Sequence, residues 1–229
     1  MKKSLPIIII AVVLLVALGG GALLMRSPSG DEKPSAGAAS NAARPARAVA
    51  DDAPPAHVRG RADAPVRFEE FSDFQCPTCG AMHTVVKQLT EKYPTQVGVA
   101  FRHYPLREMH KHAAEAARAA EAAGMQGKFW EMHDLLYEKQ GEWSAPADAR
   151  TFFMRYAQSL GLDANRFAED MDGSVVAMRV VADERRGQAL GVHGTPTFFV
   201  NGRELTFEDS KTLEKLSAAV DAELASPKR

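Results

Sequence analysis

The residues best suited to chemistry are Cys76 and Cys79, the only cysteines among the 229 residues. A Cys-x-x-Cys pair between a strand-like run and a helix-like run is typical of a redox site, because the two thiols can form a small disulfide. A helix that begins at Cys76 directs free backbone N–H groups and a positive dipole end at its sulfur. We therefore expect the pKa of Cys76 to be lowered and its thiolate to be reactive. The alternative is a structural disulfide, which would stabilise the fold little across so short a loop.

The two residues between the cysteines differ in what they can contribute. Pro77 falls in the first helical turn, where its missing N–H costs nothing, so a purely structural role is one interpretation. Thr78 has a hydroxyl that can hydrogen-bond the Cys76 thiolate without adding charge.

The segments around the cysteines have the pattern of one strand–helix–strand unit. Residues 66–71 read as a strand, 76–92 have helical spacing of apolar residues, and 97–103 read as a second strand that Pro105 closes. Two strands joined by a crossover helix are typically parallel and adjacent. Downstream, Gly and Pro residues divide a long stretch with helical pattern. After it come an apolar strand, a hairpin turn at Asn201 and Gly202, and a last helix. The predicted elements are helices at 113–123, 128–139, 147–160, 164–170 and 175–190, strands at 197–200 and 203–206, and a helix at 209–224.

At this point the sequence resembles the DsbA-like family of thioredoxin-fold thiol:disulfide oxidoreductases. Three patches carry the resemblance: residues 70–75, which lead into the Cys-x-x-Cys pair, residues 101–106 before an alanine-rich helix, and residues 191–198. The resemblance implies an α/β thioredoxin-like domain over residues 58–229, with a helical insertion at about 107–190 that splits the sheet.

The resemblance also assigns roles around the cysteines. It makes Cys76 the attacking and attacked sulfur and Cys79 its partner. In this family the residues at Pro77 and Thr78 tune the potential, and the familiar strong oxidases have histidine where this chain has Thr78. That departure leaves the direction of electron flow open.

Two further features follow from the resemblance. Thr195 and Pro196 match the cis-proline loop, which lies across from the cysteines and pairs its backbone with substrate; a trans proline at a strand entry is the alternative. Glu70 matches a buried acid that moves protons for Cys79, a task that a raised pKa suits. A solvated Glu70 is the alternative, since we expect only one of Glu70 and the adjacent Glu69 to face inward. Asp73 is expected to be a loop or capping residue.

A metal site is the other chemistry to weigh, because His83 lies four residues after Cys79 on the same helical face. Structural zinc needs four ligands, and no second pair of cysteines or close histidines completes the set, so we predict no metal. The other histidines are expected at the surface or at helix caps: His103, His110, His112, His133 and His193. Of these, His110 and His112 are also candidates for the rim of the active-site face. The larger apolar side chains of the insert are expected to pack its interior: Met82, Met109, Met125, Met132, Trp130 and Trp143.

The first 57 residues predict a membrane segment and a tether. Leu5 to Leu24 is an apolar run that spans about 30 Å as a helix, and lysines precede it. We therefore expect residues 1–25 to be a transmembrane signal-anchor in the inner membrane, with the rest of the chain in the periplasm. A cleaved signal peptide that releases a soluble periplasmic protein is the alternative. Residues 26–57, rich in Ala and Pro, are expected to be a flexible linker.

Composition and motifs together favour an enzyme over a binding module. With 28 basic and 29 acidic residues, the chain has no electrostatic footprint for nucleic acid. The favoured function is a periplasmic oxidoreductase without cofactor that donates the Cys76–Cys79 disulfide to reduced protein substrates, and the resemblance implies a DsbB-like membrane partner that reoxidises it. A reductase of the same fold is the first alternative. A copper-binding module that uses both thiolates is the second.

Overall fold

A computed structural model describes residues 56–226, and its centre is a five-stranded sheet in the order β1-β3-β2-β4-β5. The strands are β1 (Val58–Gly60), β2 (Val66–Ser72), β3 (Val97–His103), β4 (Thr197–Val200) and β5 (Arg203–Glu204). β2 and β3 are parallel, and the other neighbouring strands are antiparallel. The parallel pair and the strand at 197–200 confirm the sequence prediction; β1 was missed because three residues carry no periodic pattern.

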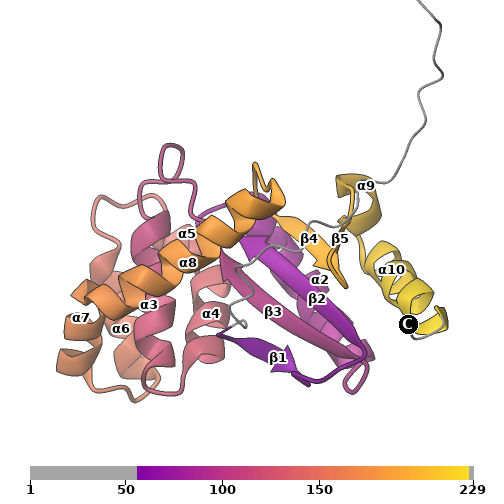
Figure 1. The fold of residues 1–229 in the computed structure, drawn as a ribbon. Helices are drawn as coiled ribbons and strands as arrows, with labels where there is room; N and C mark the ends of the chain where they lie inside the picture. The colour runs from indigo at the N-terminus through magenta and orange to yellow at the C-terminus, as the bar shows by residue number, and fades with distance from the viewer. Residues whose placement is uncertain (1–55, 227–229) are drawn as a thin grey trace, which may run out of the picture. The chain divides into compact units, whose positions relative to one another are not determined.

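Helices cover both faces of this sheet (Figure 1). On one face, α2 (Pro77–Lys92) and α10 (Leu213–Ala225) pack on β2 and β3 through Phe68, Leu89 and Leu216. On the other face lies α8 (Ser174–Leu190), which approaches so closely that a Cβ at Gly187 would stand 2.8 Å from the ring of Tyr104. Because both faces are covered, side chains that point in either direction from residues 68–72 of β2 are buried, whereas Arg67 near its start is exposed.

The segment between β3 and β4 is helical, as predicted. It consists of α3 (Ala113–Gly124), α4 (Phe129–Glu138), α5 (Gln140–Trp143), α6 (Arg150–Ser159), α7 (Ala164–Asp172) and α8. The predicted helix at 128–139 is thus followed by a separate short one, and the predicted helix at 209–224 is divided into α9 (Phe207–Ser210) and α10. The core of the insert contains Trp143 and Met132, and it extends to Cys79 and Phe74, so the active-site loop lies between two apolar cores.

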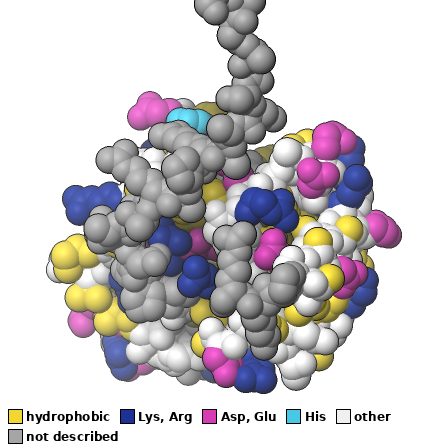
Figure 2. All heavy atoms as spheres, turned by 45° about the vertical axis from the view of Figure 1, so that its right-hand side comes forward, with side chains coloured by type: hydrophobic (Ala, Val, Ile, Leu, Met, Phe, Trp, Pro, Cys, Tyr) yellow, Lys and Arg dark blue, Asp and Glu magenta, His cyan; other side chains and the backbone are white. Residues whose placement is uncertain are grey.

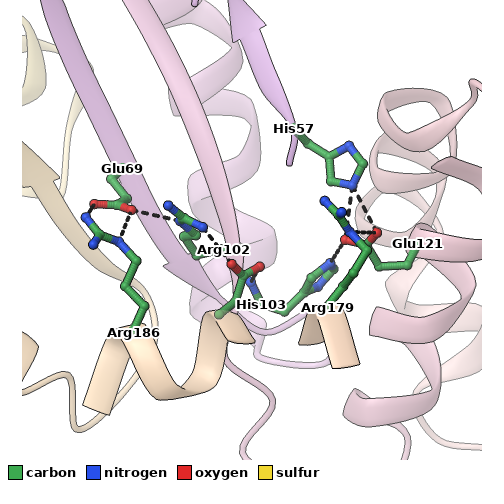
Figure 3. A network of polar contacts seen from close by, with 8 residues as sticks. His57, Glu69, Arg102, His103, Glu121, Arg179 and Arg186 are labelled. Carbon is green, nitrogen blue, oxygen red and sulfur yellow. Dashed lines mark hydrogen bonds and ion pairs between the residues drawn. The ribbon is translucent and has the colours of Figure 1, made fainter. Parts of the chain in front are cut away.

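The expectation that only one of Glu69 and Glu70 faces inward was wrong, because both are buried, at 5% and 3% exposure. Alternation along β2 sends Glu70 toward α2 and Glu69 toward α8. There the Glu69 carboxylate accepts hydrogen bonds from Arg102 at 2.8 Å and Arg186 at 2.7 Å (Figure 3). A buried charge is tolerated only with compensation, and Glu69 has two guanidinium partners.

The histidine prediction was wrong for His103 and His133, which are buried at 1% and 4% exposure. His103 ends β3 and contacts Glu121 at 2.9 Å, within a cluster that also contains His57 and Arg179 (Figure 3). The insert supplies Glu121 from α3, so no local pattern reveals the pairing. A buried histidine becomes favourable once tertiary structure provides its hydrogen-bond partner.

The apolar prediction for the insert was wrong at three methionines. Met109 and Met125 are exposed, at 76% and 38%, and Met82 packs in the core beneath the sheet instead of in the insert.

On the face shown in Figure 2, Lys and Arg side chains are interspersed with Asp and Glu where described atoms are visible.

The predicted signal-anchor at residues 1–25 and nearly all of the predicted linker at 26–57 lie outside the described residues. Within residues 56–226, no helix has the length and apolar character needed to cross a membrane.

Candidate active site

The two cysteines lie where β2 passes into α2. Cys76 is the N-cap residue and Pro77 stands in the first turn, so the helix begins as the sequence predicted. Cys76 retains 7% exposure, whereas Cys79, one turn into the helix, has none. Pro77 and Thr78 are exposed beside them. Both cysteines are free thiols, and of the two only Cys76 is accessible to a substrate sulfur.

The pKa of Cys76 is lowered from 9.0 to about 5. The largest cause is a hydrogen bond from the Cys79 thiol; burial opposes it, while the backbone of Cys79, the side chain of Thr195 and the backbone of Thr78 lower the pKa further. The contribution of Thr78 named among these causes comes from its main chain, whereas the sequence suggested its hydroxyl. Cys76 is consequently a thiolate at neutral pH.

Cys79 has the opposite behaviour, since burial holds its pKa well above the usual value and the neighbouring Cys76 adds to the shift. Two groups at the same site thus differ in protonation, one a stable thiolate and the other a thiol. A thiolate beside a protonated partner is the arrangement in which one sulfur attacks and the other must gain or lose a proton.

The loop at residues 191–196, which joins α8 to β4, reaches the cysteines. The peptide bond between Thr195 and Pro196 is cis. The Cys76 sulfur stands 3.5 Å from the backbone oxygen of Thr195, so this loop borders the reactive sulfur directly. The helix before it ends at Gly191, whose left-handed φ of 82° allows the sharp turn into the loop.

Hydrogen bonds between the active-site loop and the insert hold the loop in place. The Gln140 amide donates to the carbonyl oxygens of Phe74 and Cys76 at 2.7 and 2.9 Å. Gln75 donates to the Ser144 carbonyl at 2.9 Å. Sequence reasoning missed these two glutamines, because each bonds to backbone that folding brings from far along the chain.

Asp73 is buried and organises the same loop, which agrees with its predicted loop role. One carboxylate oxygen accepts the backbone N–H of Gln75 at 2.7 Å, and the other accepts that of Leu106 at 2.8 Å. The ring nitrogen Nδ1 of His110 stands 2.7 Å from the second oxygen. Asp73 therefore ties the segment before Cys76 to the segment after β3.

Glu70 lies on the face of β2 that meets α2, and burial raises its pKa to about 7. One carboxylate oxygen, Oε1, has no hydrogen-bond partner in the described part of the chain. A carboxyl that changes protonation near neutral pH is suited to exchange a proton with the reaction.

His83 belongs to a charged cluster under α2. Its Nε2 and the Nδ1 of His133 stand 3.0 and 2.9 Å from one oxygen of Asp134, a spacing that also brings three potential metal ligands together. Arg59 donates to the same oxygen at 2.7 Å, and the Lys87 ammonium is 3.7 Å from the other. Two fixed cations at one carboxylate disfavour a metal ion, so we interpret the group as an ion-pair cluster.

Comparison with known proteins agrees with this geometry. Residues 52–222 match the family model described as thioredoxin. The chain belongs to the thioredoxin family. Among solved structures, this thioredoxin-family protein is similar to a thioredoxin-like oxidoreductase from Silicibacter pomeroyi, with a TM-score of 0.62 and 28% identity over 75% of this chain and 93% of the other. The fold is also that of alpha-DsbA1 from Wolbachia pipientis, with a TM-score of 0.64 and 21% identity over 72% of this chain and 88% of the other. Its structural neighbours thus include DsbA-like proteins.

The curated relatives of this thioredoxin-family protein bear a different name. One from Salinispora arenicola, 46% identical over 169 residues, is named a Na(+)/H(+) antiporter NhaA; the match covers 74% of this chain and 25% of that protein. The chain therefore spans about a quarter of the length of that relative. Since the match covers only a quarter of that protein, the antiporter name is not carried over to this chain.

Proposed function

We propose that this protein is a periplasmic thiol:disulfide oxidoreductase that works in the oxidising direction and donates its Cys76–Cys79 disulfide to reduced protein substrates. The observation that carries the proposal is the pKa of Cys76, lowered to about 5. In each cycle a substrate thiolate attacks the Cys76 sulfur, the Cys79 sulfur leaves, and the substrate's second thiolate then releases Cys76 as its thiolate.

The stabilised thiolate supports the direction. At neutral pH, a thiol with a pKa of about 5 instead of 9.0 lowers the free energy of the dithiol by about 3 kcal/mol. For a two-electron couple this raises the reduction potential by about 60 mV. The dithiol is then the preferred form, so the disulfide is readily passed to other thiols.

The partial accessibility of Cys76 and the adjoining cis-proline loop support a protein substrate. Because the backbone of Thr195 borders the sulfur, an extended peptide that pairs with this loop would present its own cysteine to Cys76. For reoxidation we propose a DsbB-like membrane partner, with residues 5–24 as the anchor that keeps the domain near it. Carbonate extraction of membranes and protease access in spheroplasts test the anchor; loss of the protein into the soluble fraction would favour the cleaved signal peptide.

The test of direction is the reduction potential of the pair, measured by equilibration with glutathione buffers. We expect a value well above the roughly −270 mV of thioredoxin. A value at or below that level would overturn the oxidising direction and leave a reductase. Metal analysis of the purified protein accompanies it, since copper that is retained through purification would favour the binding module.

A further inference from the structure

Cys79 cannot exchange its proton with bulk water directly. Its side chain has no exposure, and Ser72, Glu70 and Tyr137 around it are exposed by only 1%, 3% and 5%. Yet thiol:disulfide exchange requires the Cys79 sulfur to gain a proton when it leaves Cys76 and to lose one when it attacks. Some buried group must carry that proton.

The Ser72 side chain interacts with both the sulfur and the acid. It follows Glu70 by two residues on β2, so both side chains point to the face that meets α2. Its hydroxyl lies near enough to lower the pKa of Cys79 and of Glu70. In the resting structure the hydroxyl is hydrogen-bonded to the Tyr137 hydroxyl at 2.8 Å, and rotation of one side-chain bond redirects it.

Tyr137 itself is held as a neutral phenol. Burial is the largest cause of its raised pKa, and the charges of Cys79 and Glu70 raise it further. The tyrosine hydroxyl therefore anchors Ser72 without giving up its proton.

A small cavity adjoins the other side of Glu70. Its volume is about 10 Å³, near the minimum that holds one water molecule, and its wall includes Glu70, His83, Arg59 and Lys87. The Lys87 side chain is 43% exposed, so the wall extends to the molecular surface. The unpartnered oxygen of Glu70 is thus the kind of buried polar atom that an ordered water satisfies.

We propose that the Ser72 hydroxyl passes the proton between the Cys79 sulfur and the Glu70 carboxyl, and that the cavity beside His83 connects Glu70 with solvent. When a substrate thiolate forms its bond to Cys76, the bond between the two protein sulfurs breaks with its electron pair on Cys79. Ser72 gives its proton to that thiolate and takes one from the Glu70 carboxylic acid. The reverse step moves each proton back, and Glu70 re-equilibrates with water.

This inference rests on thiol:disulfide exchange and not on its direction, because the same proton moves in either direction. It goes beyond the expected role of Glu70, since it names Ser72 as the group that connects Glu70 with Cys79 and the cavity beside His83 as the route from Glu70 to solvent. The titratable and charged groups that face Glu70 or the cavity beside it are Cys79, His83 and Lys87 on α2, Arg59 on β1, and His133 and Tyr137 on α4, with Asp134 bonded to His83. Among them, His83 and Arg59 lower the pKa of Glu70 by their charge.

The test is the rate at which dithiothreitol reduces the oxidised full-length protein, measured by acid quench and thiol alkylation across pH. Ser72→Ala should slow the reaction by about 100-fold and remove the inflection of Glu70 from the pH profile. Ser72→Thr keeps a hydroxyl and should retain both the rate and the profile. A Ser72→Ala protein with the unaltered rate and profile would overturn the inference.

Tyr137→Phe is the second variant, and it decides the matter if Ser72→Ala does not fold. Removing the tyrosine hydroxyl leaves Ser72 free to serve Cys79 and Glu70, so the rate and its solvent deuterium isotope effect should be retained. A loss of about 100-fold in this variant would mean that the tyrosine carries the proton, contrary to the inference. A low reduction potential would remove the oxidising function proposed above, but would leave these results standing.

Discussion

Removing the Cys79 thiol tests what stabilises the Cys76 thiolate. The hydrogen bond from Cys79 is the largest cause of the lowered pKa of Cys76. A hydrogen bond to a charged group contributes about 1.5 to 3 kcal/mol, which corresponds to about 1 to 2 pKa units. Cys79→Ala should therefore raise the pKa of Cys76 from about 5 to roughly 6 to 7. Cys79→Ser keeps a donor at the same place and should leave the pKa near about 5.

The assay follows the ultraviolet absorbance of the thiolate and the rate of iodoacetamide alkylation as functions of pH. Each Cys79 variant has Cys76 as its only thiol, so both signals report on one group, and a Cys76→Ser protein supplies the baseline for absorbance. The reasoning is refuted if Cys79→Ala and Cys79→Ser give the same pKa as the unaltered protein. In that case the backbone N–H groups at the start of α2 would suffice to hold the thiolate.

Three further outcomes are expected. The reduction potential should fall by about 30 mV per pH unit above pH 5, because on reduction Cys79 takes up one proton while Cys76 remains a thiolate. Potentiometry in glutathione buffers checks this slope, and about 59 mV per pH unit, the value for uptake of two protons, would contradict it. Glu70→Gln should stabilise the protein by about 3 kcal/mol above neutral pH and change nothing below about pH 4. The reason is that a raised pKa in the folded state contributes stability below the pKa of the unfolded state, and this stability is lost as pH rises through about 7. Urea unfolding across pH measures the gain, and an equal gain at every pH would contradict the prediction. Glu69→Gln should lower the free energy of unfolding in urea by about 3 to 5 kcal/mol, because it leaves two buried guanidinium groups without their carboxylate. Asp63→Asn, in an exposed ion pair, should leave the unfolding midpoint unchanged, and equal effects of the two substitutions would refute the argument.

Local patterns were sufficient for most of the longer elements of this protein but not for β1, for the breaks after α4 and before α10, or for its buried charges. The strand at 97–103 and the helix that begins at the first cysteine follow from apolar periodicity and from a proline at a helix start, both short-range effects. Glu69 was misjudged because alternation assumes one wet face, and α8 covers the face that would otherwise be wet. His103 was misjudged because its partner Glu121 comes from the insert.

The sequence by itself determined the reactive pair and the strand and helix that hold it, because these depend on residues within a few positions of one another. The proline of the loop across from the pair was expected from the family resemblance and not from a local pattern. Only the tertiary structure decided how protonation is divided between the two sulfurs and which groups serve them. Burial of Cys79 beneath the insert and the hydrogen bonds of Gln140 both require distant segments to meet. A pKa depends on desolvation and on neighbouring charge, and both are set by packing in space and not by order along the chain.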